Sequence, residues 1–383
     1  MELMSSMVVR NDDARGPVAG LPVLALNSGS SSLKFGLYRV GPTQVDTLLS
    51  GESESFSRIM KVLENASELP TPLAIGHRVV HGGPSLRHHC LIDDSVMTKL
   101  EAATAFAPLH TPATLSVIRC ALERFPAAAQ AACFDTAFHA DMPDVARVLA
   151  IPRELQLEGI HRYGFHGLSL ESILHQLGDS PPKRVVVAHL GNGASVTAVK
   201  EGKSIDTSMG LTPAGGLVMG TRSGDLDPGV LIYLMRQKAL DPAAIEVLIN
   251  RRSGLLGISG IGSDMRSLHE AASTKPDARL AVQMFCYTVR KQVAAMIAVL
   301  DGVDLIVFTG GIGENDARVR AEICRGLSWI GVSLDEGSNR SHVNPVNDSA
   351  SRCAVQVLAS QEDEQIARHT WALTATVDPN RAI

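Results

Sequence analysis

The sequence lacks the features of a membrane protein or a nucleic-acid-binding protein. Its longest apolar runs, such as Val185–Leu190 and Ala294–Leu300, are far shorter than the roughly 20 residues that cross a bilayer. No run is rich in lysine or arginine, and 35 basic residues against 40 acidic ones give a net charge of −5. This balance argues against a polyanion as the main partner. We therefore expect neither a membrane nor a nucleic acid as partner.

The sequence also lacks paired cysteines and an export signal. Its six cysteines form no CxxC pair, which argues against a zinc site or a redox dithiol and is typical of reduced thiols in the cytoplasm. Residues 1–20 contain Asp12 and Asp13 but no apolar core, so we interpret them as a loosely ordered extension and not as a signal peptide. We expect a cytoplasmic protein.

The length and the order of apolar segments predict two α/β domains. A chain of 383 residues exceeds one ordinary hydrophobic core. Strand-like Val23–Asn27 and Leu33–Val40 flank a turn of small residues, and Val185–Leu190 and Ser195–Val199 repeat this pattern in the second half. The repeat suggests a duplicated domain, although so short a match leaves duplication open on its own.

Helix-like and strand-like segments alternate along the rest of the chain, which favours an α/β fold. Helices are expected over Ser95–Ala107, Pro112–Arg124, Leu280–Leu300 (largely buried) and Asn315–Gly326; strands over Ala131–Asp135 and Asp304–Thr309; a surface loop over Asn344–Ser351.

Two turns of small residues are candidate phosphate sites. Gly310–Asn315 (GGIGEN) follows a strand and opens a helix, where bare backbone N–H groups favour an anionic ligand, although a tight connection is the alternative. It is neither GxGxxG nor GxxxxGK[ST], so a nucleotide would bind by another fold. The turn from Asn27 to Lys34 offers hydroxyls, backbone donors and one lysine, which suits phosphate and Mg²⁺-bound water; a serine-rich hairpin is the alternative.

Single polar residues also stand at strand ends. His77 and His81 have the spacing of a zinc protease, but Arg78 replaces the glutamate that this chemistry needs, so Arg78 is better interpreted as a clamp for a carboxylate or phosphate. Asp135 ends an apolar strand and could equally cap the next helix. His166 lies between glycines, which indicates a nearby pocket. The loop 220–229 is polar and flanked by glycines, as a plain surface turn would also be.

Together these segments resemble the acetate kinase family, within the larger acetate-and-sugar-kinase and actin superfamily. The resemblance runs from Val23 to Arg368. It is carried, in the family's order, by Leu26–Phe35, Gly76–Gly83, Ala107–His110, Phe134–His139, Arg162–Gly167, His189–Ser195, Met209–Pro213, Met219–Gly229 and Phe308–Asn315.

The resemblance implies an α/β fold of two duplicated ribonuclease H-like (actin-like ATPase) domains with the active site in the cleft between them. The first domain would comprise residues 1–134 and 364–383, and the second, nucleotide-binding and dimerising, residues 135–363. The implied reaction is a reversible, direct in-line phosphoryl transfer between ATP and acetate that gives acetyl phosphate and ADP. It implies Mg²⁺, with Mn²⁺ as an alternative, and a homodimer.

The resemblance also assigns residues. Catalysis falls to Asp135, His166 and Arg222. Substrate binding falls to Arg78, with an apolar slot of Val80, Leu109, Phe165 and Pro213. The metal falls to Asn27 and Glu362, with Glu364 as a near competitor for the second position. Nucleotide binding falls to Lys34, His189, Leu190, Gly191, Asn192, Gly193, Asp264, Met265, Arg266, Gly311, Ile312, Gly313, Glu314 and Asn315.

Chemistry and departures from the family pattern refine these assignments. Acetate is already ionised at pH 7, so we favour an orienting or metal-shell role for Asp135 over proton abstraction. Ala214-Gly215 replaces the usual leucine–glutamate pair near the substrate mouth. A propionate or other short-chain carboxylate kinase is the alternative enzyme, because an apolar slot separates one methylene by only about 1–3 kcal/mol. A non-catalytic, nucleotide-responsive binding protein is the alternative class, and the presence of Arg78, Arg222 and Asp135 speaks against it.

Overall fold

The computed structural model describes residues 20–29 and 33–377. The serines at 30–32 of the first turn, and all but the last residue of the predicted extension, lie outside the described residues. The chain divides into two compact units. Unit 1 comprises residues 1–140, 167–172 and 361–383, and unit 2 comprises residues 141–166 and 173–360. No helix of the described ranges is long and apolar enough to cross a membrane.

Unit 1 contains a mixed sheet in the order β3-β2-β1-β4-β6-β5. Its strands are β1 (Leu21–Ser28), β2 (Leu33–Val40), β3 (Val45–Ser53), β4 (Ala74–Val79), β5 (Cys90–Leu91) and β6 (Ala129–Phe134). β1 pairs antiparallel with β2 and parallel with β4, and β4 pairs parallel with β6. The carboxyl ends of β1, β4 and β6 therefore lie at one edge of the sheet.

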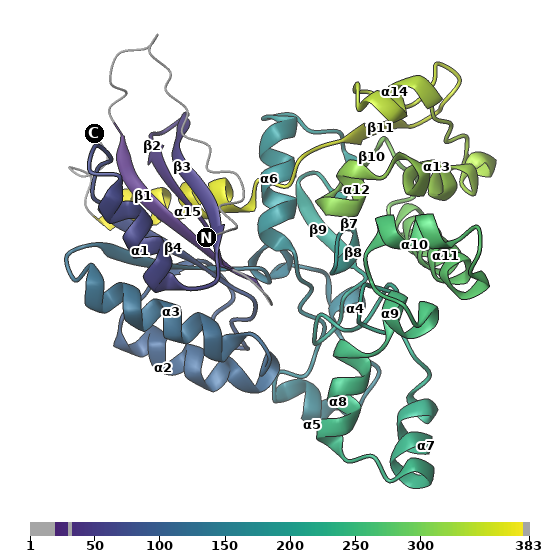
Figure 1. The fold of residues 1–383 in the computed structure, drawn as a ribbon, viewed down its shortest axis with the longest axis horizontal. Helices are drawn as coiled ribbons and strands as arrows, with labels where there is room; N and C mark the ends of the chain where they lie inside the picture. The colour runs from purple at the N-terminus through teal and green to yellow at the C-terminus, as the bar shows by residue number, and fades with distance from the viewer. Residues whose placement is uncertain (1–19, 30–32, 378–383) are drawn as a thin grey trace. The chain divides into compact units, whose positions relative to one another are not determined.

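Helices cover both faces of this sheet (Figure 1). They are α1 (Phe56–Asn65), α2 (Asp94–Ala102), α3 (Thr111–Arg124) and α15 (Glu362–Val377), with short 3-10 turns η1 (Ala103–Phe106) and η2 (Ala137–His139). Side chains alternate along β1: Val23 packs toward Ile366 of α15, whereas Leu24 packs toward Ile59 of α1. Both faces of β1 are buried, and this explains why its sequence reads as one continuous apolar run.

A glycine allows α15 to lie close against β4. A Cβ added at Gly76 would lie 2.2 Å from Thr370 Oγ1 and 2.6 Å from Ile366 Cγ2, so any side chain there would displace the helix. The glycine before Arg78 therefore helps to set the distance between β4 and the helix that carries Glu362.

Unit 2 repeats the strand arrangement of unit 1. Its sheet, in the order β11-β10-β7-β8-β9, consists of β7 (Arg184–Leu190), β8 (Ala194–Lys200), β9 (Lys203–Thr207), β10 (Leu305–Thr309) and β11 (Ala354–Val357). β7 is antiparallel to β8 and parallel to β10, which is parallel to β11, just as β1 relates to β2, β4 and β6. The second and third strands carry an irregularity in both sheets, at Leu37/Tyr38 and at Ala198/Val199. The predicted duplicated α/β fold is confirmed.

Two helices of unit 2 were predicted, over Leu280–Leu300 and Asn315–Gly326, and the structure adds the others. Both differ from the prediction, as does one expected loop. The helices of unit 2 are α4 (Asp144–Arg147), α5 (Arg153–Leu157), the later part of α6 (Gly167–Leu177), α7 (Pro228–Lys238), α8 (Pro242–Arg251), α9 (Gly254–Ser259), α10 (Met265–Ala271), α11 (Pro276–Val299), α12 (Gly310–Asn315), α13 (Ala317–Arg325), the 3-10 turn η3 (Ser328–Ile330) and α14 (Glu336–Ser341).

The differences have local causes. α11 packs on β7, β8 and β9 with one face only, so the prediction of a largely buried helix was wrong: Met284 and Tyr287 are exposed. The helix expected over Asn315–Gly326 begins at Ala317, because the Asp316 carboxylate accepts the N–H groups of Arg318 and Val319 and starts a new helix. The expected surface loop Asn344–Ser351 contains the buried Val346, whose N–H donates to Val355.

Candidate active site

Three strand ends of unit 1 bring together an amide, a guanidinium and a carboxylate. Asn27 lies near the end of β1, Arg78 near the end of β4, and Asp135 directly after β6. Arg78 Nε lies 3.1 Å from each carboxylate oxygen of Asp135, and Nη2 lies 2.7 Å from Oδ2. Arg78 Nη1 donates to Asn27 Oδ1 at 3.1 Å. Parallel pairing of β1, β4 and β6 is what places these residues side by side, although 108 positions separate the first from the last.

The first turn of α15 adds two carboxylates to this group. Asn27 Nδ2 donates to Glu362 Oε2 at 3.2 Å and to Asp363 Oδ1 at 2.7 Å. Glu364, the competing position, pairs instead with Arg368 one turn further along the helix. The structure therefore brings Glu362 and not Glu364 to Asn27, and it adds Asp363. Because three acidic residues stand in succession, the sequence alone could not show which of them contacts Asn27.

Carboxylates outnumber cations in this group. Burial raises the pKa of Asp135 above its usual range despite the opposing charge of Arg78. Burial also raises the pKa of Asp363, and the neighbouring Glu362 charge adds to this effect. The charge of Lys34, which is exposed on β2, acts in the opposite direction and lowers the pKa of Asp363. Carboxylate oxygens with excess negative charge are ligands that Mg²⁺ prefers, so Glu362 and Asp363, with the Asn27 amide beside them, fit the implied metal.

The four residues of the predicted apolar slot for the acid differ in their exposure and in the unit to which they belong. Val80 is buried in unit 1, whereas Leu109 is 37% exposed. Phe165 is only 1% exposed in unit 2, and Pro213 is partly exposed. Phe165 therefore packs as a core residue of unit 2.

Unit 2 places His166, Arg222 and Gly193 next to one another. A Cβ added at Gly193 would lie 3.2 Å from Arg222 Nη1 and 3.3 Å from His166 Nε2. His166 stacks on His189 with ring centroids 4.1 Å apart, and its Nδ1 lies 2.9 Å from Ser195 Oγ. It caps α6 with φ at +63°, a left-handed conformation that is costly for a residue other than glycine.

A cavity of about 1030 Å³ in unit 2 collects most of the predicted nucleotide-binding residues. Those that line it are Gly191, Asn192, Asp264, Met265, Arg266, Gly311, Ile312 and Asn315. Three loops, which follow β7, precede α10 and open α12, therefore meet at one cavity. Its size falls at the upper end of the range for small-molecule sites.

The other predicted nucleotide residues do not line this cavity. Leu190 and Gly313 are buried, and His189 and Gly193 adjoin His166. Glu314 shapes the turn, because its Oε1 accepts the N–H groups of Gly310 and Ser360. Lys34 belongs to unit 1.

Two arginines and a histidine that the sequence analysis missed also line the cavity. Arg318 and Arg340 line it, as does His269, whose Nε2 lies 2.8 Å from Asp316 Oδ2. Burial would raise the pKa of Asp316, but the bonds from His269 and from backbone N–H groups outweigh it and lower the pKa. Beneath the glycine turn the fully buried Arg320 donates to the Gly313 and Glu314 carbonyls at 2.8 and 2.9 Å.

Known proteins are similar to this chain in sequence. The acetokinase family model matches residues 49–368, which span both units. The acetate kinase of Nitrobacter hamburgensis is 42% identical, over 92% of this chain and 96% of the relative. The acetate kinase of Methylocella silvestris is 41% identical, over 92% and 97%. The chain belongs to the acetokinase family.

Solved structures of the family show the same fold. A propionate kinase from Francisella tularensis superposes with a TM-score of 0.83 at 38% identity, over 92% of this chain and all of the other. The acetate kinase of Porphyromonas gingivalis gives 0.79 at 34% identity, also over 92% of this chain and all of the other. The predicted family and its actin-like ATPase fold are thereby confirmed.

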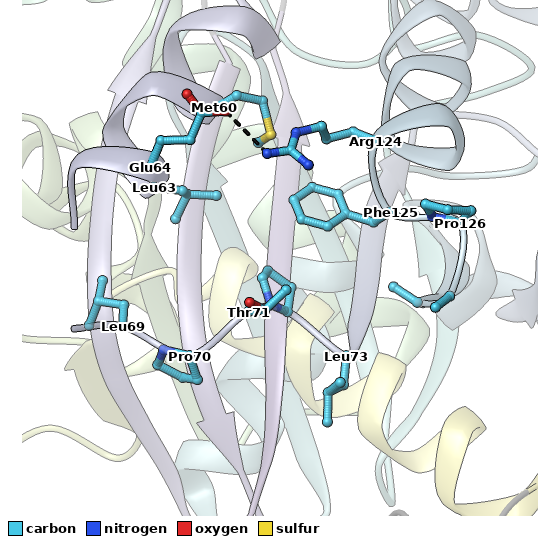
Figure 2. A pocket seen from close by; sticks show the side chains of 13 residues that line it. Met60, Leu63, Glu64, Leu69, Pro70, Thr71, Leu73, Arg124, Phe125 and Pro126 are labelled. Carbon is cyan, nitrogen blue, oxygen red and sulfur yellow. Dashed lines mark hydrogen bonds and ion pairs between the residues drawn. The ribbon is translucent and has the colours of Figure 1, made fainter. Parts of the chain in front are cut away.

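A second cavity, of about 410 Å³, lies in unit 1 away from all of these residues (Figure 2). Phe125, Leu63 and Leu73 line it, and Arg124 Nη2 donates to Glu64 Oε1 at 3.1 Å across its rim. Leu73 directly precedes β4, so this cavity lies at the opposite edge of the sheet from Arg78 and Asp135. None of the predicted site residues line it.

Proposed function

We propose that this protein is an acetate kinase, which transfers the γ-phosphoryl group of ATP reversibly to acetate and gives acetyl phosphate and ADP. The family and the names of its relatives support the reaction. The observation that carries the proposal is the meeting of Asn27, Arg78, Asp135 and Glu362 at one sheet edge. The resemblance assigns Arg78 to the acid, Asn27 and Glu362 to the metal, and Asp135 to catalysis.

The chemistry divides between the two groups of residues. A carboxylate oxygen of acetate attacks the γ-phosphorus, and the bond from phosphorus to the β-γ bridging oxygen breaks, so ADP leaves directly. Arg222 and His166 donate to the phosphoryl oxygens, where negative charge is spread in the transition state. The cavity of unit 2 holds the nucleotide, and Arg318 and Arg340 add positive charge to its lining.

We assign the metal to Asn27, Glu362 and Asp363 and place Mg²⁺, or Mn²⁺, there largely through water. A divalent cation supplies charge neutralisation to the phosphates when bound. Asp135 keeps the guanidinium of Arg78 oriented and needs no proton, because acetate arrives ionised.

The direct test is a coupled assay of ADP formation with acetate, propionate and butyrate in the presence of Mg²⁺. We expect turnover with acetate and none without an acid. Absence of turnover with all three acids, in a protein that still binds ADP, would move the function to a nucleotide-responsive binding protein.

Propionate is the second candidate acid, because the propionate kinase structure superposes with the higher TM-score of the two compared above. An added methylene changes binding by about 1–3 kcal/mol, which corresponds to a ratio of roughly 10–200 in kcat/KM. A kcat/KM for propionate above that for acetate would make this protein a propionate kinase.

Arg78→Ala is expected to raise the KM for acetate by about 10–100-fold while the KM for ATP changes little, since a charged fork binds one substrate only. Thermal stability should also fall, because the buried Asp135 loses its partner. Steady-state kinetics with each substrate varied measures this effect. Arg58→Ala, an exposed arginine of the same unit, is the control. An equal rise in both KM values would show that Arg78 does not select the acid.

We also propose that the protein is a homodimer paired through unit 2. α7 is an apolar helix with no buried residue, and Ile232 and Tyr233 are 48% and 57% exposed. Water contact with such a helix is unfavourable in a monomer, and a second copy would cover it. Scattered free cysteines, four of them buried, support the cytoplasm as its location.

Ile232→Asp is expected to convert the dimer into a monomer, because it places a charge in an apolar interface. Sedimentation velocity measures the change. Val145→Asp, at an apolar position 94% exposed in the same unit, should leave the dimer intact. Dissociation by both variants, or by neither, would assign the interface elsewhere.

A further inference from the structure

Two histidines and a glutamate of unit 1 form a cluster to which the proposed function gives no role. His89 directly precedes β5, Glu171 lies on α6, and His369 lies on α15. Glu171 Oε1 lies 3.3 Å from His89 Nε2, and Oε2 lies 2.9 Å from His369 Nε2. The two imidazole rings lie against each other with centroids 3.9 Å apart and planes tilted by 39°. One carboxylate thus joins three segments that are remote in sequence.

Each of these segments also contacts or carries part of the candidate active site. His89 Nδ1 accepts the backbone N–H of Phe134 at 3.0 Å, next to Asp135. The first residue of α6, Gly167, donates its N–H to the Asp135 carbonyl at 2.8 Å. On α15, His369 lies two turns after Glu362. The cluster therefore contacts the end of β6 and the helix that begins with the metal-binding carboxylates.

The hydrogen bonds argue against a metal in this cluster, although its three ligand atoms lie within 4.8 Å of one another. Because His89 Nδ1 accepts a backbone N–H, the hydrogen of the neutral ring is on Nε2, which then has no lone pair for a metal. His369 Nε2 lies 2.9 Å from Glu171 and 3.0 Å from the amide nitrogen of Gln365. It either donates to the first or accepts from the second, so its lone pair is not available to a metal in either case.

The charges expected for Glu171 and His89 are those that favour hydrogen bonds between them. Burial would raise the pKa of Glu171, but the bonds from His369 and His89 lower it to about 2, so the carboxylate is ionised at neutral pH. Burial lowers the pKa of His89, which keeps that ring neutral. An ionised carboxylate accepts strong, directional bonds from N–H donors.

We propose that Glu171 is a positioning residue that holds Asp135 and the first turn of α15 in place for phosphoryl transfer through His89 and His369. This inference rests on the proposed acetate kinase activity. Displacement of a reacting group by about 1 Å can cost 10²-fold in rate. Loss of the cluster acts on two sides of the same group, on Asp135 through β6 and on Glu362 and Asp363 through α15.

Glu171→Gln in the full chain tests the proposal, because the amide keeps the shape but cannot accept from both rings. We expect kcat to fall by about 10–100-fold and the Mg²⁺ concentration for half-maximal activity to rise several-fold, with the KM for ATP unchanged. Thr374→Val, which removes another buried hydrogen bond of α15, is the matched control and should leave all three values unchanged. Unchanged kcat and Mg²⁺ dependence in Glu171→Gln would overturn the proposal, whereas an inactive wild-type protein would overturn the proposed function instead.

Two variants of His89 separate its two links. His89→Asn keeps an acceptor near the Nδ1 position for Phe134, and His89→Gln keeps a donor near the Nε2 position for Glu171. If the links act in series, each variant lowers kcat, and Glu171→Gln adds little to His89→Asn. Fully additive losses would show that the residues act separately. A rise in melting temperature on adding Zn²⁺ to the wild type, but not to Glu171→Gln, would overturn the proposal in favour of a metal site.

Discussion

Arg222→Ala is expected to lower kcat by on the order of 10²–10³-fold, with only modest changes in the KM values for ATP and acetate. Arg222 and His166 both adjoin Gly193, so the guanidinium and the imidazole can act on one phosphoryl group. The charge on that group is largest in the transition state, and a cation that binds the transition state more strongly than the ground state changes kcat and not KM. Steady-state kinetics in both directions of the reaction measures the effect.

A conservative replacement of Arg222 separates the effect of its charge from that of its planar shape. Arg222→Lys keeps the charge but loses the planar fork, so we expect it to recover part of the lost kcat. Arg325→Ala, an exposed arginine of the same unit, is the control and should retain the wild-type rate. A kcat for Arg222→Ala near the wild-type value, or a loss confined to the KM for ATP, would remove Arg222 from the transferring group.

Much of the fold could be predicted because both sheets are built from apolar runs that end in punctuated turns. β7 and β10 were predicted within one residue of each end, since strands buried on both faces need continuous apolar sequence. The amphipathic α11 was misjudged because alternation of apolar and polar residues does not say which apolar positions face the sheet. The exposed Met284 and the buried Met296 are the same residue type, so hydrophobicity cannot distinguish them.

The candidate site was predictable in its residues and not in its pairing. The sequence motifs indicated separate roles for Arg78, as a clamp for the acid, and for Asp135, as a catalytic group. The structure shows that the two side chains bind each other. Sequence spacing cannot show this, because the contact depends on the parallel register of β4 and β6. Arg318 and Arg340 were missed for a different reason: exposed arginines on helices are ordinary, and only the cavity distinguishes these two.

The first turn of α15 is expected to determine the Mg²⁺ requirement of the enzyme. Glu362→Gln and Asp363→Asn are expected to raise the Mg²⁺ concentration for half-maximal activity by at least about tenfold while the protein stays folded. Both carboxylates accept from Asn27, and each replacement removes a charge without removing volume. Asn27→Ala should shift the requirement less, because an amide attracts a hydrated cation only as a dipole. Titration of activity with Mg²⁺ at saturating ATP measures the shift.

Glu364→Gln is the matched control for this turn, since Glu364 pairs with Arg368 and not with Asn27. Mn²⁺ binding, followed by electron paramagnetic resonance with ADP present, gives a readout that does not depend on turnover. It should weaken in Glu362→Gln and stay at the wild-type value in Glu364→Gln. The reverse result, with a shift in Glu364→Gln alone, would place the metal-binding carboxylate two residues later and would require α15 to be rotated from the position in which Asn27 contacts Glu362 and Asp363, because residues two apart on a helix point in different directions.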